Sequence, residues 1–124
     1  MPERRVMCVS FDRAVSETRC AALKQAGYLV TPTSRMEEAL ELLSSQKFDL
    51  IIVGHRFPTD DKRALAVEAR DKWNTPVLLV CGVSADSEIP AAGRVYALEG
   101  TTGLVTAVRA LLPTEAPAAP EAAA

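Results

Sequence analysis

Three short apolar runs of the chain constrain the fold more than any other feature. Apart from two cysteine thiols, they contain no polar side chain. They occupy residues 6–9, 50–53 and 77–81. A strand with one face in water alternates apolar and polar residues, whereas a strand of a parallel sheet is covered by helices on both faces and is apolar throughout. The three runs therefore predict the central strands of a parallel sheet in an α/β fold.

Helical patterns and two weaker strand patterns fill the intervals between these runs. Residues 28–31 and 95–98 are short, β-prone and bounded by turn residues, so we expect a five-stranded sheet. Apolar residues recur at helical spacing in four intervals, which open at residues that can start or cap a helix: Asp12, Ser34, Pro58, and Thr101 or Thr102. Short right-handed crossovers between such strands give a doubly wound sheet.

Local signals predict where several of these elements begin and end. Asp12 is placed to cap the first helix, and Gly27 is placed to end it. Ser34 and Glu37 have the spacing of a capping box, so we expect their side chains to close the first turn of the second helix. Pro32 is expected to close the second strand because proline has no backbone donor.

The segment 83–93 departs from this regular alternation. It is polar and small, and Pro90 disfavours a helix before it. We therefore expect a loop with at most one or two helical turns, so that the helix of the fourth crossover is shortened or irregular. Apart from Thr114, residues 113–124 are Ala, Pro and Glu with little to bury, which predicts a folded domain at 1–112 followed by a disordered tail.

Composition and charge argue against several classes of partner. Lysine and arginine number 14 against 16 acidic residues, so the net charge of −2 indicates no basic surface for nucleic acid or anionic lipid. No apolar run approaches the length of a secretory signal or a membrane span. We expect a cytoplasmic protein that has no cofactor, no metal, and neither nucleic acid nor membrane as a partner.

The residues that most often carry chemistry are few. His55 is the only histidine, and no second ligand lies near it in sequence, so we expect an ordinary loop residue. The three cysteines, Cys8, Cys20 and Cys81, have no C-x-x-C spacing and are expected to be small buried residues. Ligands of doubly wound sheets bind beyond the carboxyl ends of the strands, which directs attention to the residues that follow each strand.

With these elements in place, the chain resembles the receiver domains of two-component response regulators. The resemblance runs from about residue 5 to residue 82 and resumes over 95–112. It rests on Ala26-Gly27-Tyr28, the helical pattern of 36–43, the stretch 48–53 followed by Arg56-Phe57-Pro58, and Thr75-Pro76 before the next strand. It implies a flavodoxin-like sheet of strand order 2-1-3-4-5 and a place in two-component signalling.

Receivers accept a phosphoryl group on an aspartate at the end of the third strand. The resemblance implies that they also need an acidic pair for Mg²⁺, a hydroxyl residue after the fourth strand and a lysine after the fifth, because phosphoryl transfer depends on positioning and charge neutralisation. In this chain the acidic pair is replaced by Ser10 and Phe11, the acceptor by Gly54, the hydroxyl by Cys81 and the lysine by Glu99. The resemblance therefore implies the fold of a receiver without its phosphotransfer.

The leading hypothesis is a non-phosphorylatable, receiver-like interaction module that is not an enzyme. Its partner is expected to be a protein, either a signalling component or a second copy of the chain. The resemblance places the usual partner face on the fourth helix, the fifth strand and the fifth helix. Because the fourth helix is expected to be shortened here, the last strand and the last helix remain, which indicates Tyr96, Thr106 and Arg109.

The alternative hypothesis is a small-molecule sensor that uses the altered pocket at the strand ends. We expect Phe11 to fill that pocket in place of the lost acidic pair. A filled pocket would favour the interaction module, whereas an open one lined by Ser10, His55 and Cys81 would favour the sensor.

Overall fold

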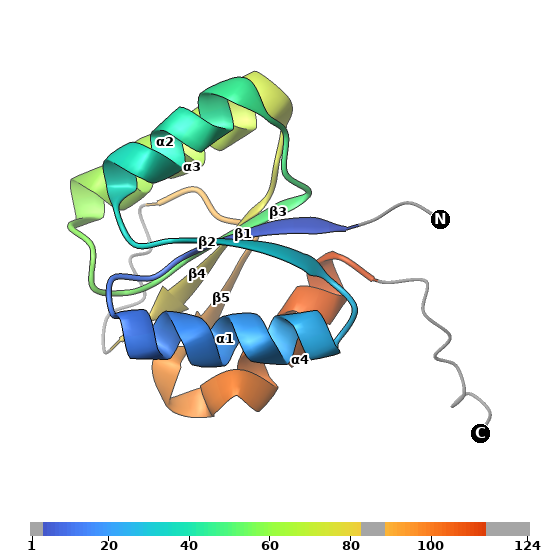
Figure 1. The fold of residues 1–124 in the computed structure, drawn as a ribbon. Coiled ribbons are helices and arrows are strands. Elements are labelled where there is room, and N and C mark those ends of the chain that lie inside the picture. Colours follow the sequence, from blue (N-terminus) through green and yellow to red (C-terminus); the bar gives the residue numbers. More distant parts are fainter. Residues whose placement is uncertain (1–3, 83–88, 114–124) are drawn as a thin grey trace.

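The computed structural model describes residues 4–82 and 89–113. Its centre is a sheet of five parallel strands in the order β2-β1-β3-β4-β5, as expected (Figure 1). The strands are β1 (Arg5–Val9), β2 (Leu29–Thr33), β3 (Leu50–Val53), β4 (Val77–Cys81) and β5 (Gly93–Tyr96). The predicted doubly wound parallel sheet and its strand order are confirmed.

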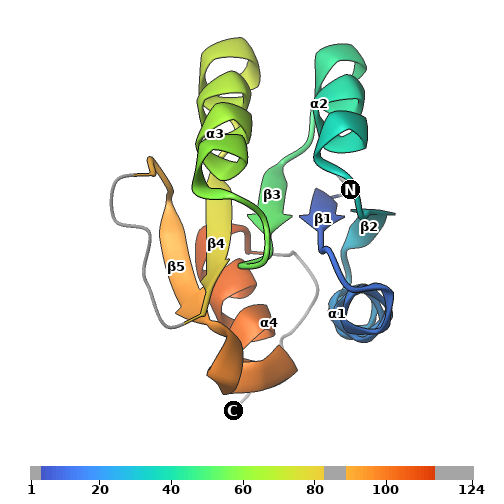
Figure 2. The same ribbon diagram turned by 90° about the vertical axis from the view of Figure 1, so that its left-hand side faces the viewer.

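Helices cover both faces of this sheet. α1 and α4 lie on one face, and α2 and α3 lie on the other (Figures 1 and 2). Their bounds are α1 (Arg13–Gln25), α2 (Met36–Ser45), α3 (Thr59–Trp73) and α4 (Gly100–Leu111). α4 corresponds to the helix predicted to open at Thr101 or Thr102.

Two hydrophobic cores separated by the sheet explain the apolar runs of the sequence. In β1, Met7 and Val9 pack into the core under α2 and α3, whereas Val6 and Cys8 pack into the core under α1 and α4. Successive side chains of a strand point to opposite faces, so a strand with a core on each side needs an apolar residue at every position. β1, β3 and β4 are buried in this way apart from exposed Arg5.

The second strand does not end at Pro32. β2 continues to Thr33, and Pro32 pairs with Cys8 of β1 in the parallel register. β2 is an edge strand with a single neighbour, and proline is tolerated there because its missing donor can face solvent. The expected boundary was wrong because the missing donor of Pro32 was taken to end the strand, whereas the predicted order 2-1-3-4-5 already places this strand at the edge.

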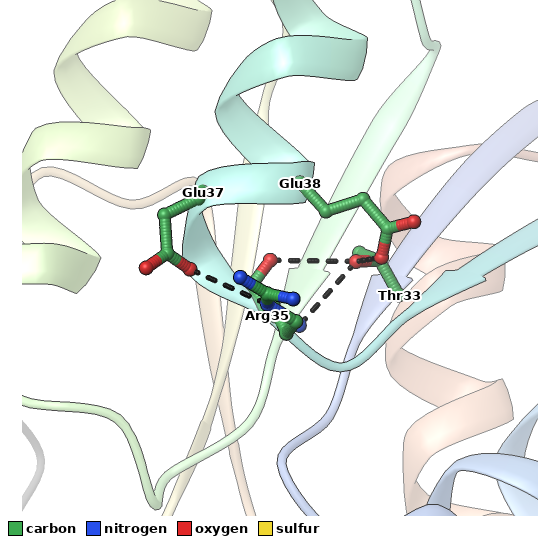
Figure 3. A network of polar contacts seen from close by, with 4 residues as sticks. All are labelled: Thr33, Arg35, Glu37 and Glu38. Atoms are coloured by element: carbon green, nitrogen blue, oxygen red, sulfur yellow. Dashed lines mark hydrogen bonds and ion pairs between the residues drawn. The ribbon is translucent and has the colours of Figure 1, made fainter.

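The expected capping box of the second helix is also absent. α2 begins at Met36 with Arg35 as its cap residue, and no side chain makes the capping bond. Figure 3 shows the contacts that form instead: Thr33 Oγ1 donates to the carboxylate of Glu38, and Arg35 Nε lies 3.8 Å from Glu37 Oε1. Thr33 is held in β2, and its hydroxyl contacts Arg35 N and the carboxylate of Glu38, where the capping box would have used Ser34 and Glu37.

The last strand and the last helix begin elsewhere than predicted. β5 starts at Gly93 and ends at Tyr96, and a short 3-10 helix (Ala97–Glu99) occupies the rest of the predicted strand. Glu99 Oε2 accepts a hydrogen bond from Tyr96 N (3.2 Å), which closes this turn. α4 then begins at Gly100 without a threonine cap.

Two further expectations concern segments outside the described residues. The predicted loop at 83–93 falls largely on residues 83–88, which are outside them, and residues 89–92 form neither helix nor strand. The tail predicted to be disordered lies outside them from residue 114 onward. Within 4–82 and 89–113, no helix combines the length and the hydrophobicity needed to cross a bilayer.

Candidate functional site

A cavity of about 420 Å³ opens beyond the carboxyl ends of the strands, on the side of the sheet that carries α1 and α4. Its wall is built from strand ends, from the first part of α1 and from the first turn of α4. The wall includes Ser10, Phe11, Asp12, Val15, Arg19, Gly54, His55, Arg56, Val80, Val95, Tyr96, Ala97 and Leu104. This is the edge at which doubly wound sheets bind their ligands.

Three of the five residues that were predicted to correspond to the receiver site lie at this cavity. Ser10, Phe11 and Gly54 form part of its wall, whereas Cys81 and Glu99 do not. Cys81 is fully buried in the sheet, with its side chain in the core under α2 and α3. The carboxylate of Glu99 is held by its own turn rather than turned toward the strand ends.

Phe11 does not fill the cavity, so this expectation was wrong. Its side chain is 59% exposed and meets the ring of Phe57 edge to face, with the ring centroids 6.0 Å apart. The guanidinium carbon of Arg56 lies 5.8 Å from the centre of the same ring. Phe11 is therefore held at the rim by an aromatic and a cationic neighbour from the loop after β3.

The helix α1 presents an arginine to the strand ends. Asp12 caps this helix by accepting from Val15 N (3.2 Å), as predicted. Ser16 and Leu23 are buried on its inner face, and Arg19 lies on the same face because it is three residues after one and four before the other. The start of α1 thus fixes the direction in which Arg19 reaches.

Arg19 lies next to Gly54, the residue predicted to correspond to the acceptor of a receiver. Its Nη1 donates to Ser10 Oγ (3.2 Å) and lies 3.4 Å from where a Cβ on Gly54 would stand. Burial lowers the pKa of Arg19 from its usual value, but the guanidinium remains charged at neutral pH. A protein cation thus lies beside Ser10 and Gly54, where β1 and β3 end.

The sequence analysis did not identify Arg19. A charged residue on the inward stripe between Ser16 and Leu23 was the available signal, because such a residue needs a polar destination. No carboxylate among the described residues lies within ion-pair distance of Arg19. Within the described part of the chain, its guanidinium makes one side-chain hydrogen bond, to Ser10 Oγ.

His55 lies in a positively charged environment. Partial burial and the charges of Arg19, Arg56 and Lys62 lower the pKa of His55, so its imidazole is neutral at pH 7. The ring packs against the backbone of Gly82, where a Cβ would come within 3.0 Å of His55 Cδ2. Across 4–82 and 89–113, no group of three or more His, Cys, Asp or Glu side chains could hold a metal ion.

A string of polar side chains runs inward from the cavity. Cys8 Sγ lies 3.7 Å from Ser10 Oγ, and Cys20 Sγ lies 4.0 Å from Ser16 Oγ. A hydrogen bond from the thiol of Cys8 lowers the pKa of Cys20 to about 6, and the same contact together with burial raises the pKa of Cys8. All three cysteines are buried, as predicted, and the thiols of Cys8 and Cys20 interact with each other.

The predicted partner residues are exposed but do not form one compact patch. Tyr96 is 45% exposed at the rim of the cavity, next to the start of α4. Arg109 lies in the last turn of α4, and its charge lowers the pKa of Tyr28 against the effect of burial. At a rise of about 1.5 Å per residue, about 14 Å of helix separates Arg109 from the start of α4 at the rim. Thr106 is exposed between them, and Leu98 beside Tyr96 is fully exposed.

Comparison with known proteins gives the fold a family of structural neighbours. No protein-family model matches the chain, and no curated protein matches it. Solved structures do match. The chemotaxis response regulator CheY4 of Vibrio cholerae has a TM-score of 0.75 and 20% identity, and the match covers 90% of this chain and 100% of that one.

Two further neighbours are response regulators of other organisms. A response regulator from Thermotoga maritima has a TM-score of 0.78 at 21% identity, and the match covers 91% of this chain and all of that one. A putative response regulator from Chloroflexus aurantiacus J-10-fl has a TM-score of 0.78 at 24% identity with the same coverage. At these identities the likeness shows that the fold is CheY-like.

Proposed function

We propose that the chain is a receiver-like protein-interaction module of two-component-type signalling whose state is not set by aspartyl phosphorylation. Its fold and its structural neighbours support the signalling class, and the site supports the loss of phosphotransfer. Such a module has a binding role and no enzymatic one, and it would act in the cytoplasm beside its signalling partners.

The observation that carries this proposal is the pairing of Gly54 with Arg19 at the end of β3. Phosphoryl transfer to a receiver needs a carboxylate nucleophile, and Gly54 has no side chain. The residues present do not fit Mg²⁺ either, because Ser10 and Phe11 replace its carboxylate ligands and the guanidinium of Arg19 lies 3.2 Å from Ser10 Oγ. A cation at this place repels a metal ion.

A protein partner would bind the surface formed by β5 and the outer side of α4. The rim aromatic Tyr96 and fully exposed Leu98 supply apolar contact area, and Thr106 and Arg109 supply polar contacts further along α4. The partner is a signalling protein or a second copy of this chain.

Phosphate donors test the proposal directly. The purified chain is incubated with acetyl phosphate and Mg²⁺, and separately with beryllofluoride and Mg²⁺, beside a receiver domain with an intact acidic site as a positive control. We expect no gain of one phosphoryl mass and no change in the amide resonances of Ser10 or Gly54. A phosphorylated chain, or saturable shifts that require Mg²⁺, would overturn the proposal.

The open cavity supports a second candidate function, in which a small molecule sets the state of the module. Phe11 leaves the cavity open, and Ser10 and His55 lie on its wall as this alternative requires. Cys81 is buried away from it. A volume of about 420 Å³ lies within the range of about 300–1,000 Å³ that is usual for small-molecule sites.

A further inference from the structure

We propose that the cavity binds a small organic acid, an oxyanion carried on an apolar body, with Arg19 as the partner of the anion. The inference rests on the second candidate function and names the chemistry of its ligand. It needs a cation that is free to bind an anion, an apolar space for the ligand body, and an access route from solvent.

The charge requirement is met by Arg19. A guanidinium carries five N–H donors, and the described part of the chain supplies one acceptor, Ser10 Oγ at 3.2 Å. No carboxylate of that part lies within ion-pair distance of it, although the side chain is half-buried on the cavity wall. A half-buried cation without an anionic partner binds an oxyanion favourably, because the two charges replace each other's lost hydration.

The surrounding charges favour an anion as well. Arg56 lies on the wall, and Arg19, Arg56 and Lys62 together lower the pKa of His55, which reports a positive potential at this edge of the sheet. Asp12 is the opposing charge on the wall. Its carboxylate accepts from Val15 N at the start of α1, where the helix dipole already stabilises it.

The apolar requirement is met by the floor of the cavity. Val80 and Val95 come from the two strands at this side of the sheet, and Leu104 comes from α4, so the interior below Arg19 is aliphatic. Aliphatic side chains offer no hydrogen bond to an inorganic anion, but they stabilise a bound hydrocarbon group by the hydrophobic effect. The ligand is therefore amphipathic, with its acid group directed at Arg19.

The rim offers two aromatic rings to the same ligand. Phe11 is 59% exposed and Tyr96 is 45% exposed, and both lie on the cavity wall. Exposed aromatic side chains at the mouth of an apolar pocket can stack on a flat ligand that extends out of it. The structure thus favours an aromatic acid over a flexible aliphatic one.

The test uses three probes and the NMR signals of the full chain. 2-Naphthoate has the acid and the apolar body, 2-naphthamide has the same body without the charge, and inorganic phosphate has the charge without the body. His55 is the only histidine, so its imidazole gives a single titration curve. We expect 2-naphthoate to shift the amides of Ser10 and Gly54 saturably, to raise the pKa of His55, and to bind at least tenfold more tightly than the other two.

Two variants of α1 assign the effect to Arg19. Arg19→Gln keeps a donor for Ser10 and removes the charge, and it should bring the affinity for the acid down to that for the amide. Arg13→Gln makes the same charge change at an exposed position outside this cavity and should leave the tenfold preference unchanged.

Each remaining outcome contradicts a separate part of the inference. Equal binding of acid and amide to the unmodified chain would overturn the role of Arg19 and leave a ligand-binding module. A response to phosphate as strong as to 2-naphthoate would overturn the apolar requirement. No response to any probe at millimolar concentration would overturn both this inference and the second candidate function, while the phosphate-donor test of the first would stand.

Discussion

Placing a carboxylate at Gly54 should create an ion pair with Arg19 rather than a phosphorylation site. The position accepts a side chain, because Gly54 is not among the glycines with positive φ, namely Gly27 and Gly100. A Cβ there would lie 3.4 Å from Arg19 Nη1 and 3.3 Å from the backbone oxygen of Val9. The first contact can relax through a flexible side chain, and the second is tight because the Val9 carbonyl accepts from Gly54 N (2.8 Å).

The expected change in the free energy of unfolding follows from comparing Gly54→Asn with the parent and Gly54→Asp with Gly54→Asn. Replacing glycine restricts the unfolded chain and stabilises by about 0.4–1 kcal/mol, which the tight contact with Val9 offsets. Gly54→Asn should therefore leave the free energy of unfolding within about 1 kcal/mol of the parent. Gly54→Asp has nearly the same shape and adds a charge beside Arg19, and hydrogen bonds between charged groups contribute about 1.5–3 kcal/mol before solvent screening.

The expected advantage of Gly54→Asp over Gly54→Asn is then about 1–2 kcal/mol at pH 7. Its pH dependence has a definite sign. The cation lowers the carboxyl pKa in the folded state below its unfolded value of about 3.9, so the advantage is present above that pH and disappears as pH falls through the folded pKa. In the Arg19→Gln background the advantage should vanish.

Urea unfolding of the six proteins measures these quantities. The set contains the parent, Gly54→Asp and Gly54→Asn, each with and without Arg19→Gln, at pH 7 and pH 3. A coupling energy below about 0.5 kcal/mol would refute the placement of Arg19 beside the strand ends. Acetyl phosphate with Mg²⁺ should leave Gly54→Asp unmodified, because Ser10 and Phe11 offer no carboxylate for the metal ion and Arg19 would pair with the new carboxylate.

Three further predictions follow from the site and its rim. Phe11→Ala should change the free energy of unfolding by less than about 1 kcal/mol, because the ring is 59% exposed, and a loss above about 2 kcal/mol in urea would show that it fills a core. His55 has a lowered pKa, so the unfolded state binds more protons and stability should fall as pH decreases through about 6.5. His55→Gln should flatten that part of the pH profile in thermal unfolding. Tyr96→Ala with Arg109→Glu should weaken self-association in sedimentation, or capture of a signalling partner, with little change in melting temperature. Glu17→Lys on α1 serves as the charge control, and unchanged binding in the double variant would show that β5 and α4 are the wrong face.

The parallel sheet could be predicted from the sequence because a strand that is buried on both faces is apolar at consecutive positions. β1, β3 and β4 each need apolar residues at consecutive positions, and that requirement is visible in a run of four or five residues. The first helix was equally readable, since Asp12 caps it and Gly27 follows it with a φ of +105°. These signals depend on backbone conformation and hydropathy within a few neighbouring residues.

Contacts between separate elements were not predicted from the local pattern. Thr33 Oγ1 donates to Glu38, five residues further on, because β2 holds Thr33 beside the start of α2. Phe11 is exposed and meets the ring of Phe57, which lies 46 residues further along the chain. The local pattern around Thr33 or Phe11 does not identify the partner of either contact.

The same distinction holds for the site. The sequence shows that residue 54 is a glycine and carries no carboxylate, because the identity of a single residue is enough to establish it. Only the tertiary structure shows that Arg19 lies beside Gly54, since α1 and the end of β3 meet there and the two residues are 35 positions apart in the chain. A side chain can reach such a position from any element that packs nearby, and packing is a property of the folded chain as a whole.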